Sequence, residues 1–233
     1  RLLLDSERAL YQTCALLQPG WEPGLKIIFD AIVPLGPLLE IIPLLRAANA
    51  PTTVQLSVDS LRGVEDRLEA EEAQAMICVI PPRFGRGTTT PLPPLSARLV
   101  AHRDHPLIRR GRSRNQAPWP LQALSAHVFL TVRGRHPELG LPTEKIDQQS
   151  TVHLSDFHAK KAAIMAGIGF GWLPDWLMES ELKRRTLVPV EIAAPNVHVF
   201  QPVLVCRSQP GRALSRIVEH LAGHEKDADR RDT

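Results

Sequence analysis

Apolar and polar residues alternate along the chain in a pattern that predicts strands and helices in turn. Residues 25–29, 53–58 and 75–79 are short apolar or alternating runs typical of strands, whereas residues 34–48 and 61–70 have the spacing of amphipathic helices. Strands and helices that alternate with short connections predict an α/β fold with a parallel sheet. The carboxyl ends of its strands then meet at one edge, where open α/β sheets bind ligands.

A second alternating segment follows a break at residues 81–94, where prolines and glycines end the periodic pattern. Strands are expected at residues 97–101 and 127–132, with a short helix at residues 119–124 between them. Residues 151–190 then predict strand, helix, strand, helix and strand in that order. The chain therefore contains two similar α/β segments.

Three glycines near residue 170 could be mistaken for a dinucleotide-binding loop. Gly167, Gly169 and Gly171 have the G-x-G-x-G spacing, but they end a helix and enter a strand. A pyrophosphate loop has the opposite order, because it follows a strand and opens a helix. We therefore interpret these glycines as a helix stop with close packing, and expect no nucleotide cofactor.

The end of the chain predicts one strand at residues 197–206 and a helix at residues 211–222. The complete pattern predicts two Rossmann-like lobes joined by two crossovers, one of them through residues 186–190. The expected boundaries are a leading helix at 1–20, a first lobe at 21–92 and 193–225, a second lobe at 93–192, and a charged tail at 226–233.

Composition and charge exclude several classes of protein. The 233 residues are 43% hydrophobic and 23% charged, with a formal net charge of +3, which is typical of a folded, water-soluble chain. No apolar run is long enough for a membrane span and no export signal precedes the first lobe, so we expect a cytoplasmic protein with no membrane partner.

Candidate chemistry is sparse. Cys14, Cys78 and Cys206 are far apart, so their spacing predicts neither a disulfide framework nor a zinc site. His102 and His105 lack the neighbouring helical carboxylate of a metallohydrolase motif, and the chain contains no G-x-S-x-G nucleophile turn. We therefore expect no metal, no cofactor and no enzymatic activity.

Helix starts carry the more useful polar residues. Asp30, Ser60, and Ser155 with Asp156 each precede an expected helix, where a short polar side chain caps exposed backbone N–H groups. A single cap of this kind can be purely structural. Three caps at the carboxyl ends of strands together predict a ligand cleft with a polar floor.

Four stretches resemble the effector-binding region of LysR-type transcriptional regulators. They are LKIIFDAIVPLGPLLEIIPLLRAANAPTTVQLSV, LEAEEAQAMICVI, LVAHRDHPL and AAIMAGIGFGWLPDWL, which together lie within residues 20–225. The last stretch, followed by LKRRTLVPV, is the most specific. The resemblance implies two lobes in a periplasmic-binding-protein-like (type 2) arrangement, with a small effector held between them and no catalysis.

The family's effector cleft, carried over to the matching positions of this chain, implies a set of binding residues. They are Asp30, Ala31, Ile32, Ser60, Leu61, Pro82, Arg83, Thr131, Arg133, Ser155, Asp156 and Phe157. An acid at position 30 would repel a carboxylate unless Arg83 or Arg133 compensates, so this position favours an aromatic or hydroxylated effector.

The same resemblance implies protein and DNA partners. Residues 1–18 are similar to the end of the linker helix that pairs subunits, so we expect a homodimer or homotetramer. Operator DNA is expected to bind through a winged helix-turn-helix that this chain does not contain. Two other classes stay open from the residues alone, namely a periplasmic-type solute-binding protein and a small α/β enzyme.

Overall fold

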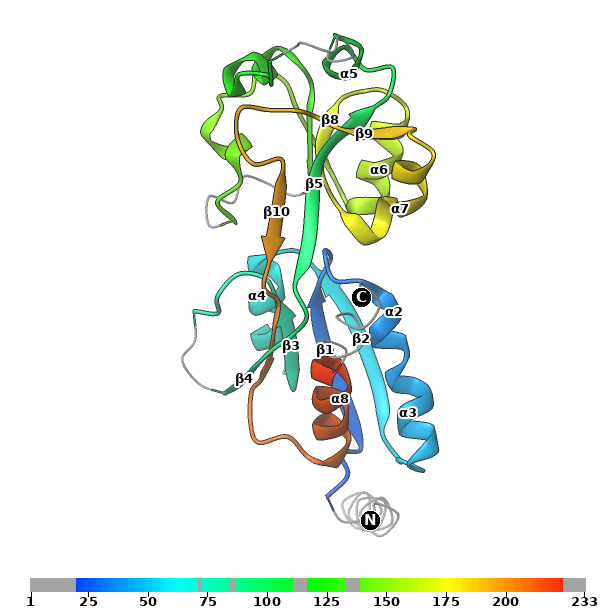
Figure 1. Ribbon diagram of the computed structural model, residues 1–233. Helices are drawn as coiled ribbons and strands as arrows, with labels where there is room; N and C mark the ends of the chain where they lie inside the picture. The colour runs from blue at the N-terminus through cyan, green and yellow to red at the C-terminus, as the bar shows by residue number, and fades with distance from the viewer. Residues whose placement is uncertain (1–19, 71–72, 84–86, 111–116, 133–138, 224–233) are drawn as a thin grey trace, which may run out of the picture. The chain divides into compact units, whose positions relative to one another are not determined.

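The computed structural model describes residues 20–70, 73–83, 87–110, 117–132 and 139–223 (Figure 1). The expected leading helix and charged tail, and Arg133 of the expected site, lie outside these residues. The chain forms two compact units: unit 1 comprises residues 1–93 and 202–233, and unit 2 comprises residues 94–201. The chain therefore passes twice from one unit to the other.

Unit 1 is a five-stranded sheet with helices. Its elements are β1 (Gly24–Asp30), α2 (Leu35–Leu39), α3 (Ile41–Ala47), β2 (Thr53–Asp59), α4 (Arg62–Ala70), β3 (Ala75–Cys78), β4 (Thr88–Pro91), β11 (Val203–Cys206) and α8 (Arg212–Gly223). The strand order is β2-β1-β3-β11-β4, and β1 runs parallel to both β2 and β3. β11 is antiparallel to β3 and β4. The predicted β-α-β-α-β order at residues 25–79 is confirmed.

The core of unit 1 forms because its central strands are apolar on both faces. Ile28 of β1 and Met76 of β3 pack against Val64 and Leu68 of α4. Just before β1, the Glu22 carboxylate accepts hydrogen bonds from the backbone N–H groups of Ala213 (2.9 Å) and Leu214 (3.2 Å), in the first turn of α8. A carboxylate at a helix N-terminus satisfies unpaired donors and complements the helix dipole. Glu22 thus joins the segment that leads into β1 to α8.

Unit 2 is a second mixed sheet. Its elements are β5 (Leu95–His102), α5 (Pro106–Arg110), η1 (Leu121–Ala126), β6 (Phe129–Val132), η3 (Pro142–Lys145), β7 (Thr151–Leu154), α6 (Phe157–Met165), β8 (Phe170–Pro174), α7 (Asp175–Lys183), β9 (Leu187–Pro189) and β10 (Val197–Phe200). The strand order is β10-β5-β8-β6-β7, and β9 pairs with β5. β6 is parallel to β7 and β8, whereas β5 is antiparallel to β8, β9 and β10.

One apolar cluster holds α6 and α7 against the sheet of unit 2, as Figure 1 shows beside β8. Ile164 of α6 and Met178 of α7 pack in it with Leu130 of β6 and Leu173 of β8, all of them without solvent exposure. The glycine interpretation is confirmed at the end of α6. Gly167 has φ +73°, and its N–H donates to the Ile164 carbonyl at 2.9 Å. A left-handed residue after the last turn is the usual glycine stop.

Three predicted elements differ from the structure. The expected helix at residues 34–48 is two helices, because the chain is interrupted at Glu40. The proline-rich break at residues 81–94 contains β4, whose threonines pair with β11. The single strand expected at residues 197–206 is two strands, β10 and β11, which belong to different sheets.

The second passage between the units also lies later than expected. Residues 193–201 belong to unit 2, because β10 pairs with β5 through Phe200↔Leu95 and Val197↔Arg98. Residues 186–190, expected to form this crossover, instead contain β9, which pairs with β5 inside unit 2. The first passage, between Pro93 and Pro94, lies one residue after the expected boundary at 92/93.

Candidate functional site

The carboxyl ends of β1, β2 and β3 lie at the same edge of the unit 1 sheet, because these strands are parallel. Asp30 ends β1 and is paired in register with Asp59, which ends β2. Three connecting segments leave this edge. They carry the expected site residues of unit 1, namely Asp30, Ala31 and Ile32, then Ser60 and Leu61, then Pro82 and Arg83. Unit 1 therefore brings its share of the predicted residues to one sheet edge.

Asp30 ties two of these segments together. Its side chain is 2% exposed, and its Oδ1 and Oδ2 accept hydrogen bonds from the backbone N–H groups of Ile32 (3.0 Å) and Leu61 (2.7 Å). A second bond joins the same segments, from the Ala31 N–H to the Asp59 carbonyl at 2.8 Å. The prediction that Asp30 caps a helix is wrong, because α2 begins after Pro34 and has no side-chain cap. Asp30 acts as a buried brace.

The backbone conformation of the segment after β2 directs an N–H group towards the Asp30 carboxylate. Leu61 has φ +52°, an uncommon conformation for a residue with a branched side chain. Its N–H donates to the Asp30 carboxylate, a charge-assisted bond. Asp59 also accepts the N–H of Ser60 at 2.7 Å. Among the described residues, the Ser60 hydroxyl has no hydrogen-bond partner, so its expected capping role is wrong and the hydroxyl is available to a ligand.

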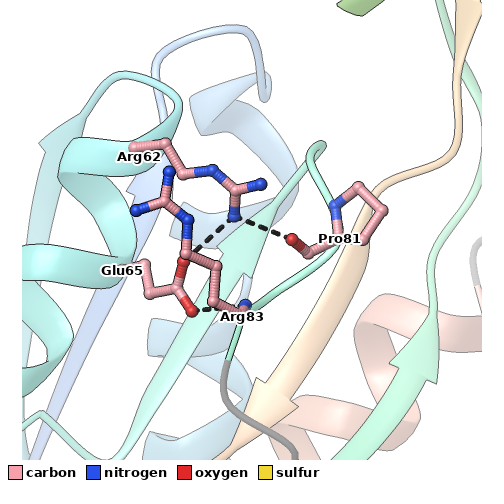
Figure 2. A network of polar contacts seen from close by, with 4 residues as sticks. All are labelled: Arg62, Glu65, Pro81 and Arg83. Carbon is pink, nitrogen blue, oxygen red and sulfur yellow. Dashed lines mark hydrogen bonds and ion pairs between the residues drawn. The ribbon is translucent and has the colours of Figure 1, made fainter. Parts of the chain in front are cut away.

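A polar network fixes the segment after β3 (Figure 2). Glu65 on α4 is 8% exposed; its Oε1 accepts the backbone N–H of Arg83 at 2.6 Å, and its Oε2 pairs with the Arg62 guanidinium at 3.0 Å. Arg62 donates a second hydrogen bond to the Pro81 carbonyl at 2.8 Å. Pro82 thus lies between two residues whose backbone groups are held by α4. Sequence reasoning missed Glu65 and Arg62, although their i, i+3 spacing on a helix was visible.

The negative charges at this edge help to raise the pKa of a neighbouring thiol, that of Cys78. Cys78 ends β3, and its pKa is raised to about 11, first by burial and then by the negative charges of Asp30 and Glu65. A thiol with a raised pKa stays protonated at neutral pH and is a poor nucleophile. The edge therefore offers hydrogen-bonding groups to a ligand and no activated cysteine.

In unit 2 the corresponding edge is formed by the carboxyl ends of the parallel strands β6 and β7. Thr131 lies near the end of β6, and Ser155, Asp156 and Phe157 connect β7 to α6. Asp156 caps α6, since its Oδ1 accepts the Ala159 N–H at 2.8 Å, as predicted. That bond, followed by the Ser155 hydroxyl donating to Oδ2, lowers the Asp156 pKa. Unit 2 thus brings these four expected residues to one edge.

Lys160 of α6 is a further polar residue close to this edge that sequence reasoning missed. Its side chain is 3% exposed, and burial lowers its pKa to about 7. A signal was present: Lys160 lies three residues after Phe157 and four before Ile164, and so shares the apolar face of α6.

The described residues contain neither a metal-binding cluster nor a membrane-spanning helix. Within them, no three His, Cys, Asp or Glu side chains are grouped so that they could hold a metal. No described helix is both long and apolar enough to cross a membrane.

Comparison with known proteins identifies similar chains. The family described as "LysR substrate binding domain" matches residues 20–226. The Escherichia coli K12 protein described as "Probable HTH-type transcriptional regulator YhaJ" is 28% identical over 192 residues, which are 78% of this chain and 60% of that protein. The chain thus spans about 60% of the length of this curated relative.

Solved structures share the fold. ArgP from Mycobacterium tuberculosis has a TM-score of 0.69 at 17% identity, covering 96% of this chain and 73% of that one. The regulatory domain of Synechocystis PCC6803 CcmR in complex with 2-PG has a TM-score of 0.65 at 19% identity, covering 88% of this chain and 99% of that one. The predicted fold class, α/β of the periplasmic-binding-protein-like type 2 kind, is confirmed by likeness to such regulatory domains.

Proposed function

The chain belongs to the LysR substrate-binding domain family, and from this premise we propose that it is the effector-sensing region of a bacterial LysR-type transcriptional regulator. One observation carries the proposal. At the carboxyl edge of the unit 1 sheet, buried Asp30 and Glu65 fix the connecting segments, while the Ser60 hydroxyl has no partner among the described residues. A rigid edge with an available polar group is what open α/β sheets use to bind small ligands.

We propose that the effector is a small organic molecule that Ser60 contacts through a hydrogen bond. The expectation of an aromatic or hydroxylated effector depended on Asp30 repelling carboxylates. Asp30 gives that preference little support, because its two oxygens accept backbone N–H groups and its side chain is buried. Effectors with an acidic group are therefore included in the proposal.

Regulation requires that the effector favour one state of the protein. A ligand shifts an equilibrium only by its difference in affinity for the two states, so the effector is proposed to bind one oligomer arrangement more tightly. The proposed oligomer is a homodimer or homotetramer, and operator DNA is proposed to bind through a winged helix-turn-helix of the full-length protein. Such a regulator acts at the chromosome, in the cytoplasm, and its task requires no catalysis.

Thermal-shift and calorimetric titrations of the chain against aromatic acids, phenols, quinones and amino acids test the proposal. A compound that binds raises the midpoint of unfolding, because it binds the folded state only. We expect Ser60→Ala to weaken this compound about fivefold to tenfold, the effect of one lost hydrogen bond. Ser125→Ala is the matched control, because the Ser125 hydroxyl is exposed and bonded to the Gln122 carbonyl at 2.7 Å.

Two results would contradict the proposal. One is a screen in which no compound shifts the midpoint. The other is a bound compound whose affinity is the same for Ser60→Ala, Ser125→Ala and the wild type. Chemical conversion of the bound compound would favour the enzyme class. In the full-length protein, footprints on operator DNA that are identical with and without a saturating effector would argue against regulation.

A further inference from the structure

Lys160 places a charged side chain inside the core of unit 2. It lies on the face of α6 that also carries Ile164, which packs against Leu130 and Leu173. Its side chain packs against β8 at Gly171, because a Cβ atom on Gly171 would lie 2.8 Å from the Lys160 Cε. The glycine therefore makes room for the lysine stem, which explains why the side chain is only 3% exposed.

Within the part of the chain that the structure describes, the Lys160 ammonium has an aromatic neighbour and no acidic one. Its Nζ lies 5.5 Å from the centroid of the Phe157 ring. Among the described residues, no carboxylate or carbonyl pairs with it. The adjacent Lys161 is different, since its Nζ donates to the Leu177 carbonyl at 2.7 Å and pairs with Glu181 at 2.8 Å. A buried charge without a partner is costly, and a protein that keeps one commonly uses it.

The position of Lys160 connects this charge with the candidate site. Phe157, over whose ring the ammonium lies, is the first residue of α6 and follows the carboxyl end of β7. The N-terminus of α6 adds a positive potential at the same place. Asp156 is the nearest acid along the chain, but its carboxylate is engaged by the Ala159 N–H and the Ser155 hydroxyl.

We propose that Lys160 binds an anionic group of the effector, such as a carboxylate, at the carboxyl edge of the unit 2 sheet, with the Phe157 ring against the apolar body of the same molecule. Because this assignment rests on the proposed effector binding, it narrows the effector class to small organic acids. The anion supplies a counter-charge that no described residue gives Lys160, so binding and protonation of Lys160 are coupled.

Matched pairs of ligands and variants test the assignment. Each aromatic acid of the screen, for example benzoate, salicylate and 4-hydroxybenzoate, is titrated beside its amide, which has nearly the same shape and no charge. For the wild type we expect at least one acid to bind about tenfold or more tightly than its amide, the gain from a charge-assisted hydrogen bond. Lys160→Met removes this difference, and Lys183→Met, at an exposed lysine, keeps it.

The outcomes separate this assignment from the proposed function. If neutral compounds bind and acids do not, or if a bound acid has equal affinity for the wild type and Lys160→Met, the anion assignment is wrong while effector binding stands. If no member of the whole screen binds, the proposed function fails and the assignment fails with it.

A spectroscopic titration reports on Lys160 itself. In protein labelled with ¹³C-lysine, the Cε resonance missing from Lys160→Met belongs to this residue, and its pH midpoint is the Lys160 pKa. A bound acid should raise this midpoint by about one unit or more, because an opposite charge favours the ammonium form. A midpoint that does not change in the presence of a saturating acid would overturn the assignment. If Lys160→Met is poorly folded, Lys160→Arg identifies the resonance in the same way.

Discussion

The buried Lys160 predicts an unusual rise of stability between pH 7 and pH 9. Its ammonium is almost fully buried, and burial lowers its pKa from 10.5 to about 7. In this window the unfolded chain holds the lysine proton and the folded chain releases it. The free energy of unfolding rises with pH wherever the unfolded state binds more protons, so the cost of burying the charge is complete below pH 7 and declines above it.

The size of the rise follows from the two pKa values. The unfolded and folded states differ by about half a proton on this group at pH 7 and by nearly one from pH 8 to pH 9. A full proton contributes about 1.4 kcal/mol per pH unit, so the rise across the whole range is about 2 kcal/mol. The window ends at pH 9 because the Cys78 pKa, raised to about 11, acts in the opposite direction above it. It begins at pH 7 because the lowered pKa values of His105 and His127 act below it.

Urea denaturation at pH 7, 8 and 9 measures the effect. We expect the wild type and Lys183→Met to gain about 2 kcal/mol across this range, and Lys160→Met to be flat and more stable at pH 7. Lys183 is a suitable control because it is exposed on α7. Parallel curves for the wild type and Lys160→Met would refute the reasoning, because they would show that the lysine charge is solvated or paired in the folded state.

Three further predictions test the other features. Asp30→Ala should cost about 2 kcal/mol or more of unfolding free energy in urea, because the N–H groups of Ile32 and Leu61 lose their acceptor, whereas Ser60→Ala should change it by less than about 0.5 kcal/mol. Gly171→Ala should lower the free energy of unfolding by about 2 kcal/mol, because its Cβ would lie 2.5 Å from the Leu130 carbonyl oxygen. Gly36→Ala is the control, because a Cβ there has nothing within 4 Å, and thermal denaturation compares the two variants. Burial, followed by the charges of His127 and His102, lowers the His105 pKa to about 4. As the pH falls from 6.5 to 4, the unfolded chain therefore binds a proton at this histidine while the folded chain does not. Stability should fall over that range, and less steeply in His105→Asn, as acid titrations followed by circular dichroism would show.

The parts of the fold that could be predicted from the sequence are those with local signals. β1, β2 and β3 are bounded apolar runs, and the end of α6 has its glycine. The second passage between the units could not be placed, because β10 and β11 form one extended pattern interrupted only by Gln201 and Pro202. Strand pairing decides to which sheet each half belongs, and the hydrophobic pattern of a strand does not identify the strand with which it pairs.

In the candidate site, too, roles that depend on local partners could be predicted and roles that depend on distant partners could not. The cap at Asp156 could be predicted because its carboxylate accepts a hydrogen bond from the N–H of Ala159, only three positions later in the chain. Asp30 has a similar sequence context, but its main partner, Leu61, is 31 positions away and comes from the next strand connection. Sequence position indicated that both acids lie at sheet edges. The distinction between a half-buried cap and a buried brace required the tertiary structure.

The discontinuity of unit 1 has a consequence for the synthesis of the protein on the ribosome. β4 joins its sheet only through β11, which is made after all of unit 2. Until then β3, apolar at every position, has an unpaired edge in the nascent chain, whereas unit 2 is continuous and can complete itself first. The first unit to be translated is therefore the last to be finished, and a stop codon between the two strands β10 and β11 would leave it as a substrate for chaperones and proteases.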